Sequence, residues 1–226
     1  MAPFQVEDGR IVLRFGNLTQ EKRDELLQPY EIETGRLVWT WNHLQDSLSR
    51  LFWRTTGVSN GALAYAIWHS TPSDLAQRKM LRAAAKVRYS AADDTAALEA
   101  IEWVLNKIDS SLVHNRNDAI HAPLIIEMTT EGNTRIKPHD MTNNPRAASL
   151  EGKEILTEII RYRETADVLR RYCNALFTAL RPPRTGPLPE RPVLPHAQHT
   201  KTSKKTHKGK PRKGSRHQHL SVIEKP

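Results

Sequence analysis

The chain has 226 residues and a net charge of +9, which is concentrated at its C-terminal end. Residues 181–226 carry 12 of the 34 Lys and Arg residues but only 2 of the 25 Asp and Glu residues, so the remainder is close to neutral. The single cysteine, Cys173, excludes a disulfide within the chain. No apolar run approaches the roughly 20 residues that span a bilayer, and the N-terminus lacks the pattern of a signal peptide, so we expect a cytoplasmic location.

The first half of the chain predicts three helices. Residues 1–29 are poorly patterned, with a weak strand-like alternation at residues 10–15 and a pattern at residues 19–27 that could form a helical turn or two. Residues 32–53 repeat apolar residues at steps of three and four, which predicts a core helix ending near Gly57, and residues 60–69 predict a shorter, largely buried helix. Thr71 as the cap, Pro72 in the first helical position and Asp74 in the first turn predict a third helix. This helix should end near Val87 and carry four cations on exposed sides: Arg78, Lys79, Arg82 and Lys86.

The fourth predicted helix carries the best candidate for chemistry. Asp93 and Asp94 are interpreted as its start, and one apolar stripe follows, formed by Leu98, Ile101, Leu105, Ile108 and Leu112. The stripe would continue at residues 115 and 119, where Asn115 and Ala119 stand. Polar residues surround these two positions: Arg116, Asn117, Asp118 and His121. A core-facing surface therefore becomes polar just before Pro123 ends the helix.

The remaining elements complete a helical bundle. Residues 124–128 and 134–137 flank a Gly- and Asn-containing turn and predict a small β-hairpin. The last helix has an unbroken apolar stripe that ends before Arg181: Ile155, Ile159, Tyr162, Ala166, Leu169, Cys173, Leu176 and Leu180. The predicted fold is all-α, a bundle of about five helices with the hairpin inserted before the last long helix. The predicted divisions are an N-terminal segment (1–29), the bundle domain (30–181) and a tail (182–226).

The tail has a different composition from the bundle. Residues 182–195 are rich in proline and should be extended or disordered, and residues 196–219 have almost no apolar side chains to bury. The tail is therefore predicted not to fold alone. Its cations could neutralise several phosphates of a nucleic acid without sequence specificity: Lys201, Lys204, Lys205, Lys208, Lys210, Arg212, Lys213 and Arg216. A solubilising extension is the alternative interpretation.

The spacing of Arg116 and His121 means little by itself, because Arg followed five positions later by His occurs three times in the chain. The other two pairs, beginning at Arg191 and Arg212, lie in the tail. The pair beginning at Arg116 differs in context, since it ends a strongly periodic helix and has Asn117 beside the arginine. Arg116 and His121 point about 140° apart on an ideal helix, so they converge only if the helix bends, or else they act across an interface.

The segment from Arg116 to His121 resembles the Arg-Asn-x-x-x-His motif of the HEPN superfamily (higher eukaryotes and prokaryotes nucleotide-binding). The flanking segments 39–44, 66–70 and 152–153 are similar to bacterial proteins of that type, and the resemblance covers roughly residues 35–180. It implies a homodimer in which both motifs line one cleft. Many members of the superfamily are metal-independent endoribonucleases, some of them in toxin, phage-defence or stress systems, and others are non-catalytic binding modules.

The resemblance gives each motif residue a role that suits its chemistry. His121 would take the proton of a ribose 2′-hydroxyl and later supply one to the leaving oxygen. Arg116 would stabilise the charge that develops on the phosphate, and Asn117 would orient either the histidine or the RNA backbone. No metal or other cofactor is expected, because the histidines do not show ligand spacing. Pro123 stands where some HEPN toxins carry a tyrosine, which is a departure from the nucleotidyltransferase-paired toxins.

Structural interpretations stand beside these catalytic ones. Arg116, Asn117 and His121 also suit the C-terminal end of an ordinary helix, whose dipole favours cations. The five tryptophans are interpreted as core or dimer contacts, and His43 and Asp46 as solvated or core residues that could assist in a cleft. The alternative function is a non-catalytic helical interaction module, dimeric through its tryptophan-rich first helix, whose basic tail binds nucleic acid. The sequence identifies neither an RNA target nor an antitoxin.

Overall fold

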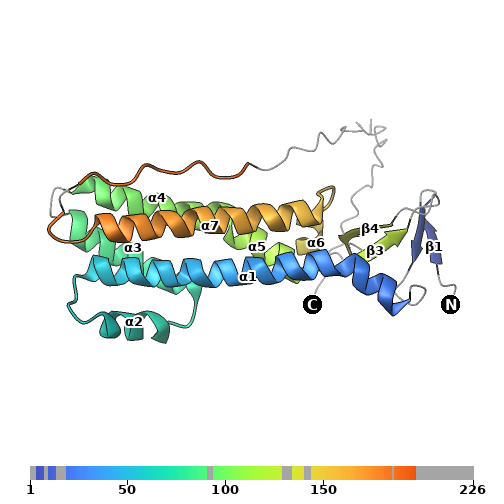
Figure 1. Cartoon of the computed structure of the whole chain (residues 1–226), viewed down its shortest axis with the longest axis horizontal. Helices are drawn as coiled ribbons and strands as arrows, with labels where there is room; N and C mark the ends of the chain where they lie inside the picture. The colour runs from blue at the N-terminus through green and yellow to red at the C-terminus, as the bar shows by residue number, and fades with distance from the viewer. Residues whose placement is uncertain are drawn as a thin grey trace, which may run out of the picture.

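The computed structural model describes residues 4–7, 10–13, 19–90, 94–128, 134–139, 144–184 and 186–196. Its centre is an all-α bundle in which the two longest helices, α1 (Gln20–Thr56) and α7 (Ile155–Ala179), lie side by side (Figure 1). Helices α3 (Asp74–Ser90) and α4 (Thr95–Ser111) complete the bundle, and α2 (Gly61–Ser70) lies at one edge, mainly against α1. A small sheet stands beyond the other end of the bundle (Figure 1). The predicted fold class is therefore confirmed.

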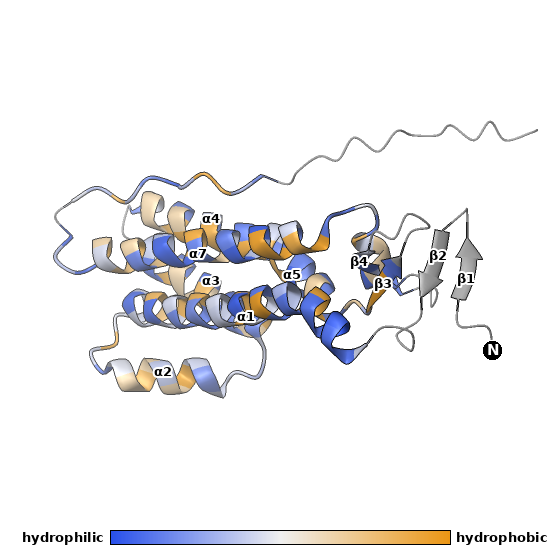
Figure 2. Ribbon diagram, turned by 45° about the vertical axis from the view of Figure 1, so that its right-hand side comes forward, coloured by the Kyte–Doolittle hydropathy of each residue, from blue (hydrophilic) through white to orange (hydrophobic). Residues whose placement is uncertain are grey.

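The predicted apolar stripes form the core of the bundle. On α1 the fully buried side chains are Leu37, Leu44, Leu48 and Leu51, and on α7 they include Ile155, Tyr162, Leu169, Cys173 and Leu176. Ile101, Leu105 and Ile108 of α4 are equally buried. Figure 2 shows apolar and polar residues in alternating patches along these helices, as expected when one face packs and the other meets solvent. Each buried leucine contributes about 1.5–3 kcal/mol relative to an exposed one.

Helix α1 begins earlier than the predicted domain boundary at residue 30. The Thr19 hydroxyl accepts a hydrogen bond from the Lys22 backbone N–H, which caps the helix ahead of Gln20. Pro29 lies inside the helix and lacks an N–H, and Figure 1 shows the first part of α1 turning away from the bundle axis. The sequence indicates these turns only as one or two helical turns at residues 19–27, because most of their side chains are exposed and they have no apolar stripe.

Two predictions about α2 and α3 were wrong. Helix α2 is not largely buried, because only Ala64 and Trp68 are, while Leu63 and Ile67 are exposed. A short helix on the outside of a bundle can bury one face only. The cap of α3 is Ser73, whose hydroxyl accepts from the Ala76 N–H at 3.2 Å, whereas Thr71 ends α2.

Arg78 of α3 also differs from its prediction, since its side chain is only 2% exposed. Its Nε donates to Asp109 Oδ1 of α4 at 2.7 Å, and Arg82 reaches the same carboxylate at 3.5 Å. Burial of an arginine requires such a partner, because an unpaired charge in the interior is costly. The partner lies 31 residues away in the sequence, and helical periodicity gives no indication of it.

The predicted hairpin is confirmed as β3 (Leu124–Met128) and β4 (Thr134–Pro138), with Ile126 opposite Ile136. The N-terminal strands β1 (Phe4–Glu7) and β2 (Arg10–Leu13) extend it to a four-stranded antiparallel sheet in the order β1-β2-β3-β4. The short helix α6 (Pro145–Ser149) connects this sheet to α7. The Glu127 carboxylate is buried in β3; burial raises its pKa, but hydrogen bonds from Arg135 and Lys137 outweigh this and hold the pKa below its usual value.

The Pro-rich segment is not a free tail up to residue 196. Residues 182–184 and 186–196, here called the strap, run in extended conformation back along the bundle beside α7 and α4 (Figure 1). Leu188 and Leu194 pack against the core, and Arg184 pairs with Asp94. Of the two predicted alternatives for this segment, extended or disordered, the structure shows the extended one, because the prolines favour an extended chain whose leucines pack on an apolar surface. The contacts of the segment with the bundle were not predicted. The cations from Lys201 to Arg216 lie outside the described residues.

Candidate functional site

The predicted motif occupies a helix of its own, α5 (Val113–His121). The predicted fourth helix was continuous to Pro123, but the backbone breaks at Leu112, a fully buried residue with φ −122° and ψ −47°. Asn115 bridges the break, since its side-chain amide donates to the Ser111 carbonyl at 2.9 Å. The break precedes Arg116, so the motif residues still share one helix. It therefore does not bring Arg116 and His121 together.

Arg116 is held on two sides. Its guanidinium carbon lies 4.3 Å from the centroid of the Trp41 ring, and its Nε and Nη2 donate to Asn117 Oδ1 at 3.2 and 2.5 Å. Trp41 is itself fixed, because its indole N–H donates to Asp74 Oδ2 at 3.2 Å. Burial lowers the pKa of Arg116 and the nearby Asp74 carboxylate acts against this, but an arginine remains charged in either case. The result is a fixed, half-buried cation between α1 and α5.

Asn117 and its neighbour Asp118 have separate structural partners. Because Asn117 Oδ1 accepts both bonds from Arg116, the amide orients the arginine and not the histidine. Asp118 Oδ2 accepts a hydrogen bond from the Ser149 hydroxyl at 2.6 Å, which joins α5 to α6. These contacts fix the rotation of α5, and with it the direction of the Arg116 side chain.

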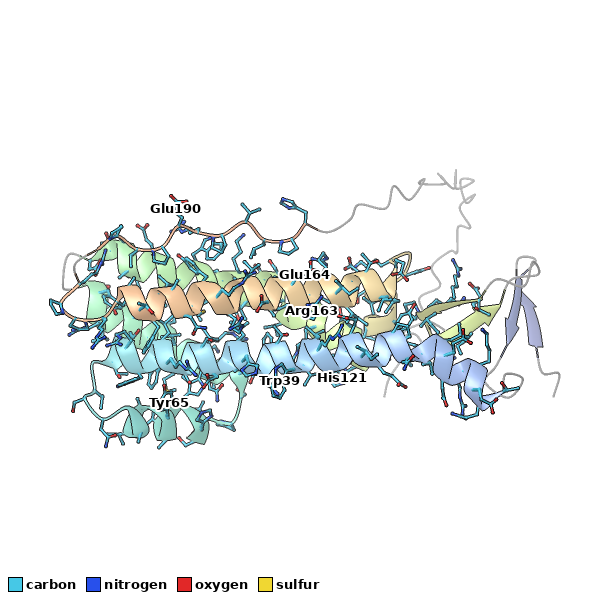
Figure 3. The ribbon with its side chains drawn as sticks, viewed as in Figure 1. Trp39, Tyr65, His121, Arg163, Glu164 and Glu190 are labelled. Atoms are coloured by element: carbon cyan, nitrogen blue, oxygen red, sulfur yellow. The ribbon has the colours of Figure 1, made fainter. Side chains whose placement is uncertain are left out.

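His121 stands apart from Arg116. It is an exposed residue in the last turn of α5 and, within the described part of the chain, makes no hydrogen bond or ion pair (Figure 3). Five helical residues correspond to a rise of about 7.5 Å and a rotation of about 140°. A single chain therefore presents the arginine against α1 and the histidine to solvent, and does not assemble them into one catalytic pair.

The other candidate residues have ordinary roles. His43 is exposed and makes an edge contact with the Trp39 ring at 4.7 Å, and Asp46 pairs with Arg50 at 2.8 Å. Asp94 caps α4 through the Ala97 N–H, as its interpretation as a helix start requires, and Asp93 lies outside the described residues. Among the tryptophans, Trp41 and Trp68 belong to the core, Trp53 and Trp103 are partly buried against it, and Trp39 is 67% exposed.

The described residues contain no group of three or more His, Cys, Asp or Glu side chains that could hold a metal ion. The helices in this part of the chain include none that is both long and apolar enough to cross a membrane. Comparison with protein-family models, curated proteins and solved structures gives no match. A functional proposal therefore depends on the motif and on the geometry around it.

The contact between Arg116 and Trp41 is the feature of this site that sequence reasoning missed. Trp41 falls on the apolar stripe of α1 and was expected to be a core or dimer contact; it lies in the core, since the residue is 3% exposed. One face of a core tryptophan at the edge of a bundle can still accept a cation from another helix. The change from apolar to polar residues at Asn115 indicated a candidate site at the end of the stripe. It did not indicate which aromatic residue would contact Arg116.

Proposed function

We propose that the protein is a metal-independent endoribonuclease of HEPN type that acts as a homodimer, with Arg116, Asn117 and His121 in its active site. The observation that carries this proposal is the environment of Arg116. Its guanidinium is fixed by an aromatic ring and an amide, and within the described residues no carboxylate forms an ion pair with it. A positioned arginine whose charge is not neutralised suits the transient negative charge of a phosphoryl centre.

The chemistry requires a base, an acid and a charge stabiliser. His121, exposed at the end of α5, takes the proton of a ribose 2′-hydroxyl. The 2′-oxygen then attacks the adjacent phosphorus and the bond from phosphorus to the 5′-oxygen breaks. The leaving 5′-oxygen receives a proton from the histidine, which gives a 2′,3′-cyclic phosphate and a 5′-hydroxyl. Arg116 stabilises the additional charge on the phosphate oxygens, and Asn117 keeps its guanidinium in place.

The separation of the two residues within one chain supports the proposal of a homodimer. A second copy would supply the His121 that faces the Arg116 of the first. Helix α1, which carries Trp41, also exposes apolar residues that such a partner could cover: Ile32 at 45%, Val38 at 40% and Trp39 at 67%. Ile32 and Trp39, seven residues apart, share one exposed face of the helix, on the side away from Trp41, and an exposed apolar face of this kind favours a protein contact.

A non-catalytic helical module that binds nucleic acid through residues 201–216 is the second candidate. The contacts of Arg116 with Trp41 and Asn117 also favour this candidate, because they give the arginine a structural role that requires no substrate. This alternative predicts RNA binding that is lost when the chain ends at residue 196 and that is indifferent to His121.

RNA cleavage and growth toxicity, measured at matched expression, separate the two candidates. The wild-type chain should cleave RNA and His121→Ala should not. Because residue 121 is exposed, this substitution should leave the fold intact. His114→Ala is the matched control, because His114 is an exposed histidine on the same helix, and it should cleave like the wild type. If the wild-type protein leaves RNA intact, or if His121→Ala cleaves at the rate of His114→Ala, the nuclease proposal is wrong.

A further inference from the structure

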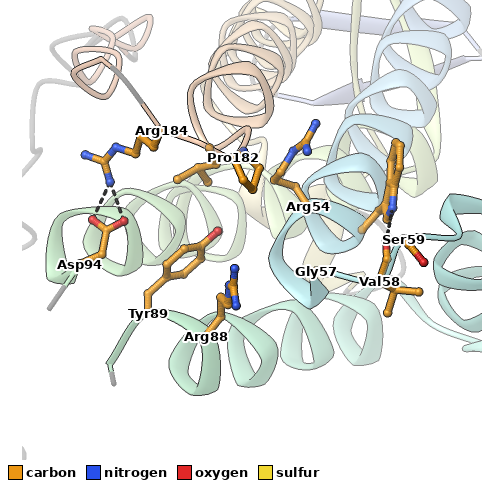
Figure 4. Close-up of a pocket in the computed structure, with 11 residues that line it drawn as sticks. Arg54, Gly57, Val58, Ser59, Arg88, Tyr89, Asp94, Pro182 and Arg184 are labelled. Atoms are coloured by element: carbon orange, nitrogen blue, oxygen red, sulfur yellow. Dashed lines mark hydrogen bonds and ion pairs between the residues drawn. The ribbon is translucent and has the colours of Figure 1, made fainter. Parts of the chain in front are cut away.

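A second candidate site lies at the opposite end of the bundle from the sheet, where α1, α3 and α7 end and α4 begins. A pocket of about 570 Å³ opens there between these helices and the start of the strap (Figure 4). Its polar and aromatic lining comes from distant parts of the chain: Trp53, Arg54, Arg88, Tyr89, Asp94 and Arg184. Pockets of roughly 300–1,000 Å³ are the size that accommodates small-molecule ligands.

The charges in this pocket do not balance. Arg184 is neutralised, because its Nη1 lies 2.5 and 2.6 Å from the two oxygens of Asp94. Arg54 has no ion pair within the described residues; its guanidinium lies 4.5 Å from the centre of the Phe177 ring, and its Nε is buried without a hydrogen-bond partner. Arg88 is exposed, also has no ion pair among the described residues, and projects toward the middle of the pocket with Tyr89 (Figure 4).

Helix dipoles offer a structural explanation for these arginines, since cations suit the C-terminal ends of helices. The partial charges of the helix ends are too small to balance the side-chain charges, so the pocket keeps an excess of positive charge. Each helix end carries about half an elementary charge, so three C-terminal ends and one N-terminal end sum to about −1. Three arginines and Asp94 sum to +2. The pocket therefore retains about one positive charge. The unpaired guanidinium N–H groups of Arg54 and Arg88 can donate hydrogen bonds to an anion bound there.

We infer that this pocket binds a small phosphate-bearing ligand of about mononucleotide size. The guanidinium groups of Arg54 and Arg88 come from α1 and α3 and would contact the phosphate as planar donors. The Trp53 ring supplies an aromatic wall for the rest of the ligand. Because Pro182 and Arg184 belong to the strap, the bound ligand would touch the segment that leads into the basic tail. This site is independent of the proposed nuclease site.

Isothermal titration of the full-length protein tests this inference with three probes: inorganic phosphate, pyrophosphate and ADP. At least one probe should bind with a stoichiometry of one per chain. Arg88→Gln and Arg54→Gln should each weaken binding about tenfold or more, because each removes a charged hydrogen-bond donor. Preference for ADP over pyrophosphate would assign a nucleotide, and equal affinity would assign the phosphate groups alone.

The control is Arg50→Gln, which removes an exposed arginine one turn earlier on α1, outside the pocket, and should bind like the wild type. Arg88 is exposed, so its variant should fold even if the Arg54 variant does not. Binding that is absent at millimolar probe concentrations overturns the inference. So does binding that is equal in the wild type and Arg88→Gln, because it would then belong to the basic tail. His121→Ala should bind the probes normally, which separates this test from that of the nuclease.

Discussion

The guanidinium of Arg116 lies 4.3 Å from the centroid of the Trp41 ring, and this contact joins the motif helix α5 to the longest helix of the bundle. Trp41 is held in turn by Asp74, so residues from α1, α3 and α5 meet at one point. A cation–π contact of this kind is worth about 0.5–2 kcal/mol. Its larger effect is on position, because it leaves the arginine few alternative conformations.

Arg116→Lys tests whether RNA cleavage requires the planar guanidinium group. The lysine keeps the charge but cannot make two hydrogen bonds to Asn117 from a planar group. We expect RNA cleavage to fall about 100-fold while thermal stability changes by about 1 kcal/mol or less. Arg146→Lys, on the neighbouring helix α6, is the control and should change neither quantity. Cleavage by Arg116→Lys at the wild-type rate would show that the guanidinium geometry has no catalytic role.

The buried ion pair between Arg78 and Asp109 predicts an asymmetric response to mutation. Asp109→Ala leaves Arg78, which is 2% exposed, without its closest carboxylate, so unfolding free energy should fall by about 3 kcal/mol. Arg78→Met removes the charge together with its need for a partner and should cost less. Asp46→Ala, which breaks the exposed pair with Arg50, should cost about 0–1 kcal/mol. Denaturant unfolding measures all three, and equal losses for Asp109→Ala and Asp46→Ala would contradict the assignment.

Glu158 predicts a specific loss of stability in acid. Burial raises the pKa of this carboxyl, but hydrogen bonds from Arg161 and Tyr162 outweigh burial and lower the pKa below its ordinary value of 4.5. A lowered folded pKa gives stability that is present above pH 4.5 and is lost as the pH falls through the folded pKa. Glu158→Gln should therefore be less stable at neutral pH and should show a shallower loss of stability below pH 4.5. The exposed Glu164→Gln should keep the wild-type profile, and identical profiles for both variants would exclude this role.

The strap should stabilise the bundle through its leucines. Leu188 and Leu194 are partly buried against the core, so replacing each with alanine should cost about 1–2 kcal/mol and should expose the strap to proteases. Val193 is 82% exposed, and Val193→Ala should alter neither stability nor cleavage. Limited proteolysis and thermal unfolding of the three variants measure this. If all three behave alike, the strap does not depend on these contacts.

The helices could be predicted from the sequence because their apolar stripes repeat on one face. Leu37 through Leu51 and Ile155 through Leu180 follow a period that only a packed helix explains, and these positions are buried in the structure. The first turns of α1 have no stripe, so the sequence indicated only one or two helical turns at residues 19–27 and not their continuity with the core helix. The break at Leu112 was hidden because Leu112 itself continues the stripe and is fully buried.

Contacts between distant residues could not be predicted in the same way. Arg78 was expected to be exposed because its own helix gives no information about Asp109, and the packing of the strap depends on an apolar surface that α4 and α7 create together. At the candidate site, the sequence predicted the polar end of a helix and the residues in it. It did not predict that Asn117 would orient the arginine, because that depends on the conformation of two neighbouring side chains.

RNA cleavage by mixed variants shows whether Arg116 of one chain and His121 of another act on the same phosphate. Arg116→Ala and His121→Ala are each expected to be inactive alone. If equal amounts of the two variants are unfolded or dissociated together and allowed to form dimers, half of the dimers should be mixed, and each mixed dimer regains one of its two sites. The mixture should therefore cleave RNA at about one quarter of the wild-type rate. A mixture that cleaves no faster than either variant alone, under conditions in which wild-type protein is active and mixed dimers form, would contradict it.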